Sequence, residues 1–504
     1  MDEKLLQNGN GFAGRFRKCS RRRRCLSTLI GLALGGSMIA WVVKWTFPAK
    51  ADPFPSPIYS MNVNFGGWLA LEDWMFSGLF QHLDKEPAKE DGRGACLPPA
   101  IPGPIDKPWP SEGILVQRLL ESDGASKTID AFRLFRETFI TSEDLDDAAS
   151  IGVKTVRVPF MWFAFADALA RIDKKTYGEF DPDIESVIVP DPFYYQQASY
   201  VTIPRQLLTE LLRNCSARGL KVVLDLHAMP SGNARGDYNG ILPLHNVFWW
   251  EKARIGNTSI ALKDAGLWIV EKFIRWVEGL DAQARGGVGG ISLMNEPGNQ
   301  LAYFLDSKDL FDWLEKAADI FRTSYLPSRG VKLYMNFIQS SINNFFELVP
   351  TWWEKTFSET ERHLWAVADV HNYLAWRDDC KGHYGNITEG GYKCDEPLEE
   401  IEAKLKQCLD PFLKDLSNDF KGLRSSGEFS MSTDYQIGYA CKNRKLLDMY
   451  LSVQVELFQK YGFEPFFWSW KVPYGPHFEP AWSYQKHVGL AKPPPFQCHA
   501  PIGT

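Results

Sequence analysis

Two glutamates stand at the ends of short apolar runs, where a buried strand has no structural need for a carboxylate. The run GISLMNE (290–296) ends in Glu296, and the run LRSSGEFS (423–430) carries Glu428 near its end. Two carboxyl groups across a sugar ring support retaining glycoside hydrolysis, in which one protonates the leaving oxygen and the other attacks the anomeric carbon. The acid/base then needs a raised pKa and the nucleophile a lowered one. Taken alone, the Asn-Glu-Pro triplet also suits a helix N-cap followed by a favoured proline.

Polar and aromatic residues close the other apolar runs as well, and chance rarely produces such an ordered set. We expect the Arg157 cation to hold Glu428 ionised. We expect Tyr373 to hydrogen-bond the same carboxylate, and Asn295 to bind the 2-hydroxyl of a sugar. The residues at the run ends, in chain order, are Arg157, Asp225, His227, Asn295, Glu296, His371, Tyr373, Glu428, Trp468 and Trp470.

Eight apolar runs alternate with longer amphipathic segments, and these elements must position the polar set. The runs are 58–65, 154–160, 221–228, 290–296, 331–338, 364–373, 423–430 and 465–471. Mostly continuous apolar strands between helices indicate a parallel sheet, and eight of them predict an α/β fold, the (β/α)8 TIM barrel. In that fold the C-terminal ends of the strands meet on one rim. A doubly wound sheet is the alternative, but no G-x-G-x-x-G motif follows an early strand.

Three stretches exceed the ordinary length of a βα loop. They are 77–130, 172–200 and 374–396. Long loops on such a barrel usually build or wall the active site, so we expect inserted loops around the rim.

The composition excludes several classes of protein. Of 504 residues, 45% are apolar and 23% are charged, which excludes a mainly disordered chain and a membrane protein with many spans. Aromatic residues reach 14%, which suits rings that stack on sugars and equally a large aromatic core. Residues 1–24 carry a net charge of +6 and the remainder −12. An acidic body argues against a nucleic-acid partner.

An uncharged run of 19 residues, from Cys25 to Val43, is long enough to cross a bilayer as a helix. Four arginines precede it, and tryptophans lie at its far end, as interfacial aromatics do. We expect a type II signal anchor that holds the body outside the cell membrane or in the Golgi lumen. The alternative is a signal peptide cleaved near Ala51, which would secrete the body. The expected parts are a cytoplasmic tail (1–24), a transmembrane helix (25–43), a Pro-rich stalk (44–57) and the hydrolase-like domain (58–504).

Nine cysteines suit an oxidising compartment. Seven follow the apolar run, so at least one of them is unpaired. Cys215 follows an apolar-periodic run, which predicts a buried helical thiol. No C-x-x-C pair occurs, so we expect no zinc site. Sequons for N-glycosylation start at Asn214, Asn257 and Asn386, and we expect Asn214 to be hidden beside Cys215.

In their order along the chain, these motifs resemble glycoside hydrolase family 5, and within it the exo-1,3-β-glucanases of fungi and related walled eukaryotes. The resemblance covers about residues 60–485. MNVNFGGWLALEDW resembles the subgroup's N-L-G-G-W-L-x-L-E-x-W opening, and ETFITSEDLDDAASIGVKTVRVPF resembles its T-F-I-T-x-x-D…V-R-I-P stretch. VVLDLHAMPSGN, LMNEP, DVHNY, GEFSMSTD and FFWSWK then follow in the family's order.

The resemblance implies a role for each matching residue. Glu296 would be the acid/base and Glu428 the nucleophile. Glu72 would hydrogen-bond the terminal glucose of an exo-acting site, and Asp237 matches an acid in the loop after the third strand. The family's active-site framework falls on Arg157, His227, Asn295, His371, Tyr373 and Trp468.

The resemblance also pairs Cys408 with Cys441 around the nucleophile, which leaves Cys380 and Cys394 as a separate disulfide in the sixth loop. Some positions depart from the family. Phe429 replaces the usual Trp after the nucleophile, Ala228-Met229-Pro230 replaces Gly-Ala-Pro, and Phe135-Arg136 stands where His-Trp is usual. None of these departures removes a catalytic group, but together they bear on subsite specificity.

What the resemblance implies is a membrane-anchored, retaining glycosidase that releases glucose from the non-reducing ends of cell-wall 1,3-β-glucan, with transglycosylation where acceptor sites exclude water. Its partners would be a β-glucan and, through the N-terminal helix, a membrane. The chemistry requires no cofactor and no metal. Two alternatives stay open: a hydrolase of another β-glucoside, such as a 1,4-glucan or a glycolipid, and a catalytically silent glycan-binding wall sensor.

Overall fold

Eight parallel strands close into a barrel in the computed structural model, which describes residues 59, 61–76, 97–101, 109–338, 342–384, 391–434, 440–473 and 480–492. Each barrel strand pairs with the next along the chain, and the last pairs with the first. The strands are β1 (Asn62–Asn64), β2 (Thr155–Met161), β5 (Lys221–Ala228), β6 (Val288–Ser292), β7 (Lys332–Phe337), β8 (Ala366–His371), β11 (Leu423–Phe429) and β12 (Phe463–Phe467). This order confirms the predicted (β/α)8 barrel.

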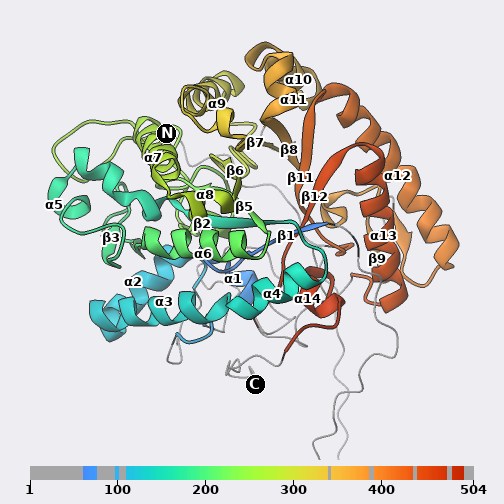
Figure 1. Cartoon of the computed structure of the whole chain (residues 1–504), viewed down its shortest axis with the longest axis horizontal. Helices are drawn as coiled ribbons and strands as arrows, with labels where there is room; N and C mark the ends of the chain where they lie inside the picture. The colour runs from blue at the N-terminus through green and yellow to red at the C-terminus, as the bar shows by residue number, and fades with distance from the viewer. Residues whose placement is uncertain are drawn as a thin grey trace, which may run out of the picture. The chain divides into compact units, whose positions relative to one another are not determined.

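Amphipathic helices lie around the outside of the strands (Figure 1). In α6 (Arg205–Ala217), buried Leu208, Leu211, Leu212 and Cys215 recur at helical spacing, so the helix turns one apolar stripe inward. The other long helices bury such a stripe too. They are α2 (Glu112–Asp123), α3 (Ala125–Phe139), α7 (Leu262–Gly279), α9 (Ser307–Arg322), α10 (Phe345–Thr356), α12 (Leu398–Asp419) and α13 (Arg444–Lys460).

The long loops predicted from the sequence contain structure of their own. The 172–200 stretch holds β3 (Ile188–Pro190), which pairs antiparallel with β4 (Ser199–Val201). The 374–396 stretch holds the short strands β9 (Gly382–His383) and β10 (Tyr392–Lys393). The first long stretch, 77–130, contains helix α2 and the beginning of helix α3. The described parts of the three insertions come after the C-terminal ends of β1, β2 and β8. They therefore lie on the side of the rim and do not interrupt the sheet.

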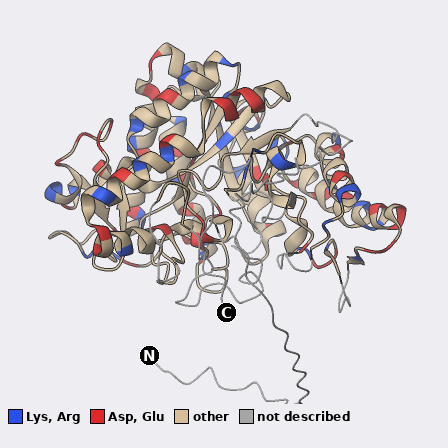
Figure 2. Cartoon of the chain, turned by 90° about the horizontal axis from the view of Figure 1, so that it is seen from below, with Lys and Arg blue, Asp and Glu red and all other residues tan. Residues whose placement is uncertain are grey.

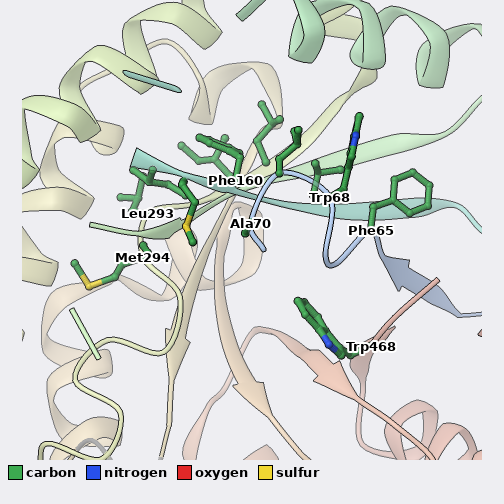
Figure 3. Close-up of a cluster of buried hydrophobic side chains, with 14 of the residues drawn as sticks. Phe65, Trp68, Ala70, Phe160, Leu293, Met294 and Trp468 are labelled. Carbon is green, nitrogen blue, oxygen red and sulfur yellow. The ribbon is translucent and has the colours of Figure 1, made fainter. Parts of the chain in front are cut away.

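Aromatic and aliphatic side chains fill the space beneath the rim. Figure 3 shows part of this buried cluster, in which Phe65, Phe160, Leu293 and Trp468 come from the segments at or just after β1, β2, β6 and β12. Each such side chain contributes roughly 2–3 kcal/mol when it leaves water. The largest fully buried rings in the described residues include Trp109, Trp162, Trp353 and Trp470. The high aromatic content could serve sugar stacking or a large core. Most of the described tryptophans are buried, so the core accounts for them.

The predicted disulfide pairing is wrong, although all four candidate cysteines are bridged. The bonds are Cys380–Cys408 and Cys394–Cys441. The physical reason lies at His383 in β9. The backbone N–H of Cys394 donates to the carbonyl of His383, and Ala440, the neighbour of Cys441, forms a β-bridge with His383. Cys394 and Cys441 therefore flank the same residue, which leaves Cys408 of α12 to meet Cys380 in the loop after β8.

Cys215 is a buried free thiol, as the sequence predicted. The expectation that Asn214 is hidden beside it is wrong, because the next position on a helix is rotated by about 100° and Asn214 points to solvent. Asn257 is also exposed. Asn386 lies outside the described residues.

Acidic and basic residues are interspersed along the described helices (Figure 2). Several pair within one helix, such as Arg275 with Glu271 and Lys308 with Asp312. Exposed pairs of this kind contribute only about 0.3–0.5 kcal/mol each, so the fold depends on burial and not on surface charge.

The predicted tail, transmembrane helix and stalk (1–57) lie outside the described residues. Within the part of the chain that the structure describes, none of the helices has both the length and the apolar character that a bilayer crossing requires.

Candidate active site

The C-terminal ends of the strands bring most of the predicted residues together. Arg157 comes from β2, His227 from β5, His371 from β8 and Glu428 from β11. Asn295 and Glu296 follow the end of β6, Tyr373 follows β8, and Trp468 follows β12. Because all eight strands run in the same direction, these ends share one rim.

Glu428 is held by two donors, one on each carboxylate oxygen. Arg157 Nη1 lies 2.7 Å from Oε1, and the Tyr373 hydroxyl donates to Oε2 at 2.7 Å. The register of β11 shifts between Ser426 and Glu428, which turns the glutamate toward the rim. Glycine is required at 427, since an added Cβ would lie 2.5–2.8 Å from the carboxylate of Asp369. Both contacts predicted for Glu428 are confirmed.

Arg157 connects four strands through one buried guanidinium. Nη1 also donates to Asn64 Oδ1 at 2.9 Å, while Nη2 donates to Asn295 Oδ1 at 2.7 Å and lies 2.9 Å from Asp225 Oδ2. Burial lowers the pKa of Arg157, but the carboxylates of Asp225 and Glu428 outweigh it and raise the pKa above its ordinary value. The cation is therefore permanent, and against the effect of burial it helps to lower the pKa of Asp225.

Glu296 accepts hydrogen bonds on both oxygens. His371 Nδ1 lies 2.9 Å from Oε1, and the Tyr238 hydroxyl and Asn299 Nδ2 donate to Oε2 at 2.7 and 2.6 Å. Its backbone N–H donates to Asn336 Oδ1 at 2.8 Å, and its φ of 41° lies in the left-handed region. That conformation costs a non-glycine residue of order 1 kcal/mol or more, and such strain is typical of functional positions.

His371 lies between the two glutamates. Its Nδ1 is 2.9 Å from Glu296 Oε1 and 3.4 Å from Glu428 Oε2. Burial lowers the pKa of His371, yet the charge of Glu428 and the contact with Glu296 raise it above its ordinary value. Burial raises the pKa of Glu296, but His371, Tyr238 and Asn299 outweigh it and lower the pKa. The sequence predicted a raised pKa for the acid/base, whereas the pKa of Glu296 is lowered and that of its neighbour His371 is raised.

The three groups also meet the simplest geometric condition for holding a metal ion. One atom each of Glu296, His371 and Glu428 lies within 4.8 Å of the others. However, donors from Arg157, Tyr373 and Tyr238 already occupy lone pairs of both carboxylates. The donor set therefore fits two hydrogen-bonded carboxylates, of which Glu296 also contacts His371, better than it fits metal ligation.

His227 and Trp468 form a second layer beside Arg157. His227 Nδ1 lies 2.6 Å from Asp225 Oδ2, so Nε2 is left as the acceptor for Asn295 Nδ2 at 3.3 Å. The His227 and Trp468 rings stack with centroids 6.1 Å apart. The side chain of Asn295 is thus oriented from both ends, with its oxygen on Arg157 and its nitrogen toward His227.

Glu72 lies within electrostatic reach of both glutamates. Trp74 Nε1 donates to its Oε2 at 2.7 Å, and its Oε1 is buried. Burial raises the pKa of Glu72 well above its ordinary value, and the charges of Asp237, Glu428 and Glu296 raise it further, against the hydrogen bond from Trp74. These effects favour the protonated form of Glu72, which has a hydrogen to donate beside the site. Asp237, in the loop after the third barrel strand β5, is close enough for its charge to act on Glu72.

Sequence reasoning missed several groups that complete the site. Asn299 could have been found, because it lies three residues after Glu296 in the same turn. Tyr238 carries no such signal, since its contact depends on the path of the loop after β5. The groups not predicted are Asn64, Tyr238, Asn299, Asn336 and Asp369.

Comparisons with known proteins agree with the motifs. No family model matches the chain. Probable glucan 1,3-β-glucosidase D of Neosartorya fischeri is 23% identical over 493 residues, covering 90% of this chain and 49% of that protein. Glucan 1,3-β-glucosidase of Lachancea kluyveri is 26% identical over 398 residues, covering 76% of this chain and 73% of that protein. The chain spans about half the length of the glucosidase D relatives. These similarities confirm the resemblance that the motifs predicted.

One solved structure shares the fold over nearly its whole length. The rutinosidase from Aspergillus niger gives a TM-score of 0.51 at 15% identity, covering 86% of this chain and 97% of that chain. The barrel is thus one that a known glycosidase uses. Among proteins of known sequence, the chain is similar to the glucan 1,3-β-glucosidases.

Proposed function

We propose that the chain is a retaining glycoside hydrolase that acts on 1,3-β-glucan and releases glucose from non-reducing ends. The observation that carries the proposal is the pair Glu296 and Glu428, which present carboxylate oxygens within 4.8 Å of each other. Carboxyl groups separated by about 5–5.5 Å suit retention, whereas inversion needs about 6.5–9.5 Å to admit a water. Similarity to glucan 1,3-β-glucosidases supports the linkage.

In the first step, Glu428 attacks the anomeric carbon while the glycosidic C–O bond breaks. The leaving oxygen takes a proton from Glu296, which receives it from His371 through the 2.9 Å contact. Arg157 and Tyr373 hold the attacking oxygen pair in place before the reaction. Asn295, oriented by Arg157 and His227, has a second amide hydrogen to donate to the 2-hydroxyl of the sugar.

In the second step, a water molecule replaces the leaving group. Glu296, now a carboxylate, takes a proton from the water as its oxygen bonds to the anomeric carbon. The bond to Glu428 breaks, and the product keeps the β configuration. The proton on Glu296 then passes back to His371, which restores the starting state. When a sugar hydroxyl takes the place of water, the same step is transglycosylation.

In this proposal, Glu72 restricts the enzyme to the ends of the glucan chain. A neutral carboxylic acid beside the two glutamates donates a hydrogen bond to a hydroxyl oxygen without adding a third negative charge. Such a donor would bind the terminal residue of a chain and block its extension in that direction.

The test uses the purified full-length protein in detergent with laminarin, a 1,3-β-glucan. Proton NMR in the first minutes distinguishes the anomer that forms before mutarotation. We expect β-glucose as the first product, and no product from Glu428→Gln or Glu296→Gln variants that unfold like the unsubstituted protein. α-Glucose first, or turnover by both variants, would contradict the proposal.

A membrane anchor is a further part of the proposal, and its support is the sequence of residues 1–57. The acidic body would then face the lumen or the outside, where Asn214 and Asn257 are exposed for glycosylation. Sodium carbonate extraction tests the anchor, because an integral protein stays in the membrane pellet. Release into the supernatant would contradict it.

A further inference from the structure

Glu296 Oε2 is enclosed by two groups from different loops. The Tyr238 hydroxyl lies 2.7 Å from this oxygen and Asn299 Nδ2 lies 2.6 Å from it, while the two donors are 2.9 Å from each other. In the proposed reaction the same carboxyl group must first give a proton and then take one. A donor fixed on Oε2 stabilises the carboxylate more than the acid, because hydrogen bonds to a charged acceptor are stronger.

The position of the Tyr238 ring is set by backbone contacts. Gly236 precedes it with φ 154°, and an added Cβ there would lie 2.2 Å from the ring. The side chain of Asn239 accepts from the backbone of Asn233 and Ala234. The ring also meets the edge of His227, with centroids 5.8 Å apart. Removing only the hydroxyl therefore leaves the ring in place.

The loops that carry the two donors are joined to each other. The Arg235 N–H donates to the carbonyl of Asn299 at 3.1 Å, and the Gly298 N–H donates to the carbonyl of Asn233 at 3.0 Å. The side chain of Asn233 donates to the carbonyl of Asn295 at 3.1 Å. The Tyr238 hydroxyl is thus held relative to Glu296 by two loops that position each other.

The hydroxyl hydrogen of Tyr238 has two acceptors. One is Glu296 Oε2, and the other is the backbone carbonyl of Arg235 at 3.2 Å. When Glu296 is a carboxylate, the hydroxyl donates to it. When Glu296 carries the proton on Oε2, the hydroxyl turns to Arg235 and its oxygen becomes an acceptor.

We propose that Tyr238 is a positioning residue whose hydroxyl follows the protonation state of Glu296 and keeps Glu296 a carboxylate in the glycosyl-enzyme, the form that the water-attack step requires. The inference rests on the proposed function, because it assigns a step of that reaction. Burial and the charge of Glu296 raise the pKa of Tyr238 well above its ordinary value, so the hydroxyl stays neutral through both steps.

The test separates the two steps with 2,4-dinitrophenyl β-glucoside, whose leaving group departs without protonation. Formation of the glycosyl-enzyme then does not need Glu296, but its hydrolysis does. For Tyr238→Phe we expect kcat and KM to fall together by about ten- to a hundredfold, with kcat/KM nearly unchanged. A burst of dinitrophenolate should precede the steady state.

Tyr194→Phe is the matched control. The hydroxyl of Tyr194 donates to the carbonyl of His245 and not to Glu296.

A pH profile of kcat/KM on laminarin provides a second readout. Losing a donor to the carboxylate makes Glu296 a stronger acceptor for the proton that it shares with His371, so the alkaline limb of Tyr238→Phe should move to higher pH. The other titratable groups that face or act electrostatically with Glu296 stay the same in both proteins: His371 from β8, Glu428 from β11, Tyr373 after β8 and Glu72 after β1.

The outcomes are distinguishable. Equal losses of kcat and kcat/KM without a burst, or an unmoved alkaline limb, would overturn the role of Tyr238 while leaving the proposed function intact. No turnover of the aryl glucoside by the unsubstituted protein would overturn the proposed function and this inference with it.

Discussion

Arg157 sets the charge balance of the site because every side chain around it is an acceptor. It is 2% exposed, contacts Glu428 and Asp225 at 2.7 and 2.9 Å, and orients Asn64 and Asn295. Without the cation, the buried carboxylates of Asp225 and Glu428 would both lose their ion-pair partner. A buried group of this kind therefore acts on folding and on chemistry together.

Replacing Arg157 with methionine, which has similar length and no charge, should impair both properties. We expect the free energy of unfolding to fall by about 3–5 kcal/mol, as when one partner of a buried ion pair is removed. We expect kcat/KM on laminarin to fall at least about a hundredfold, since Glu428 loses its main stabilising partner. Urea unfolding and initial rates measure the two effects. The control is Arg133→Met, an exposed partner of Asp130, which should change stability by less than about 0.5 kcal/mol. Equal effects of the two variants would contradict this account.

The proton that His371 shares with Glu296 predicts the alkaline limb of the pH profile. Since the two glutamates raise the pKa of His371 above 6.5, the active form should persist until the pH exceeds that value. The limb of kcat/KM on laminarin should therefore lie above pH 6.5, and His371→Asn should remove the group that titrates there. A profile of His371→Asn with the limb at the same pH would show that another residue is responsible. His363→Asn, at an exposed histidine of α11 (Glu359–Leu364), should leave the profile unchanged.

At the scale of elements, a buried ion pair joins the segment after β1 to the inserted helices. Glu112 at the start of α2 accepts from the Leu71 N–H at 3.1 Å and lies 3.7 Å from Arg136 of α3. Arg136 donates to the carbonyls of Val201 and Thr202 at the end of the β3–β4 hairpin. Arg136 is one of the departures from the family pattern, and the structure gives it this connecting role beside Glu72.

The burial of Glu112 predicts how stability depends on pH. Burial raises the pKa of Glu112 to about 7, and Arg136 and the Leu71 N–H only partly offset it. Because the folded pKa exceeds the unfolded value, the contribution is fully present below about pH 4.5 and is lost as the pH rises through about 7. Compared with Glu112→Gln, the unsubstituted protein should lose on the order of 3 kcal/mol between these values. Urea unfolding at pH 4.5 and 7.5 measures the difference.

The control for this prediction is Glu121→Gln, which changes an exposed glutamate on the same helix. Its stability should follow the unsubstituted protein at both pH values. If Glu112→Gln also follows it, the ionisation of Glu112 is not coupled to folding.

Strands were easier to predict than the connections between them. Eight apolar runs gave the barrel in the correct order because parallel strands are buried on both faces. The bounds of the observed strands differ from the predicted runs. Strand β1 covers only Asn62–Asn64, and β6 starts at Val288, before the predicted run. The β3–β4 hairpin and the disulfide pairing depend on how the insertions fold over each other, which no local pattern records. For the same reason Tyr238 was missed, whereas Arg157 and Glu428 were found at their strand ends.

At the scale of the whole molecule, the site exists only when the barrel is closed. Arg157 and Glu428 are 271 positions apart, and the contact between Asn64 and Gly427 spans 363 positions. Closure of the sheet between β1 and β12 brings the first and last strands of the domain together. The two glutamates are likewise supplied by separate strands, so their spacing is a property of the barrel and not of any local motif.

The central claim is that Glu428 forms a covalent bond to the sugar while Glu296 handles the proton. Incubation of the full-length protein with 2-deoxy-2-fluoro-β-glucosyl fluoride tests it most directly, because the fluorine slows hydrolysis of the glycosyl-enzyme while fluoride still departs. Intact mass spectrometry followed by peptide mapping should show one fluoroglucosyl group on Glu428 and none in Glu428→Gln. No adduct on an enzyme that hydrolyses laminarin, or an adduct on another residue, would contradict the account.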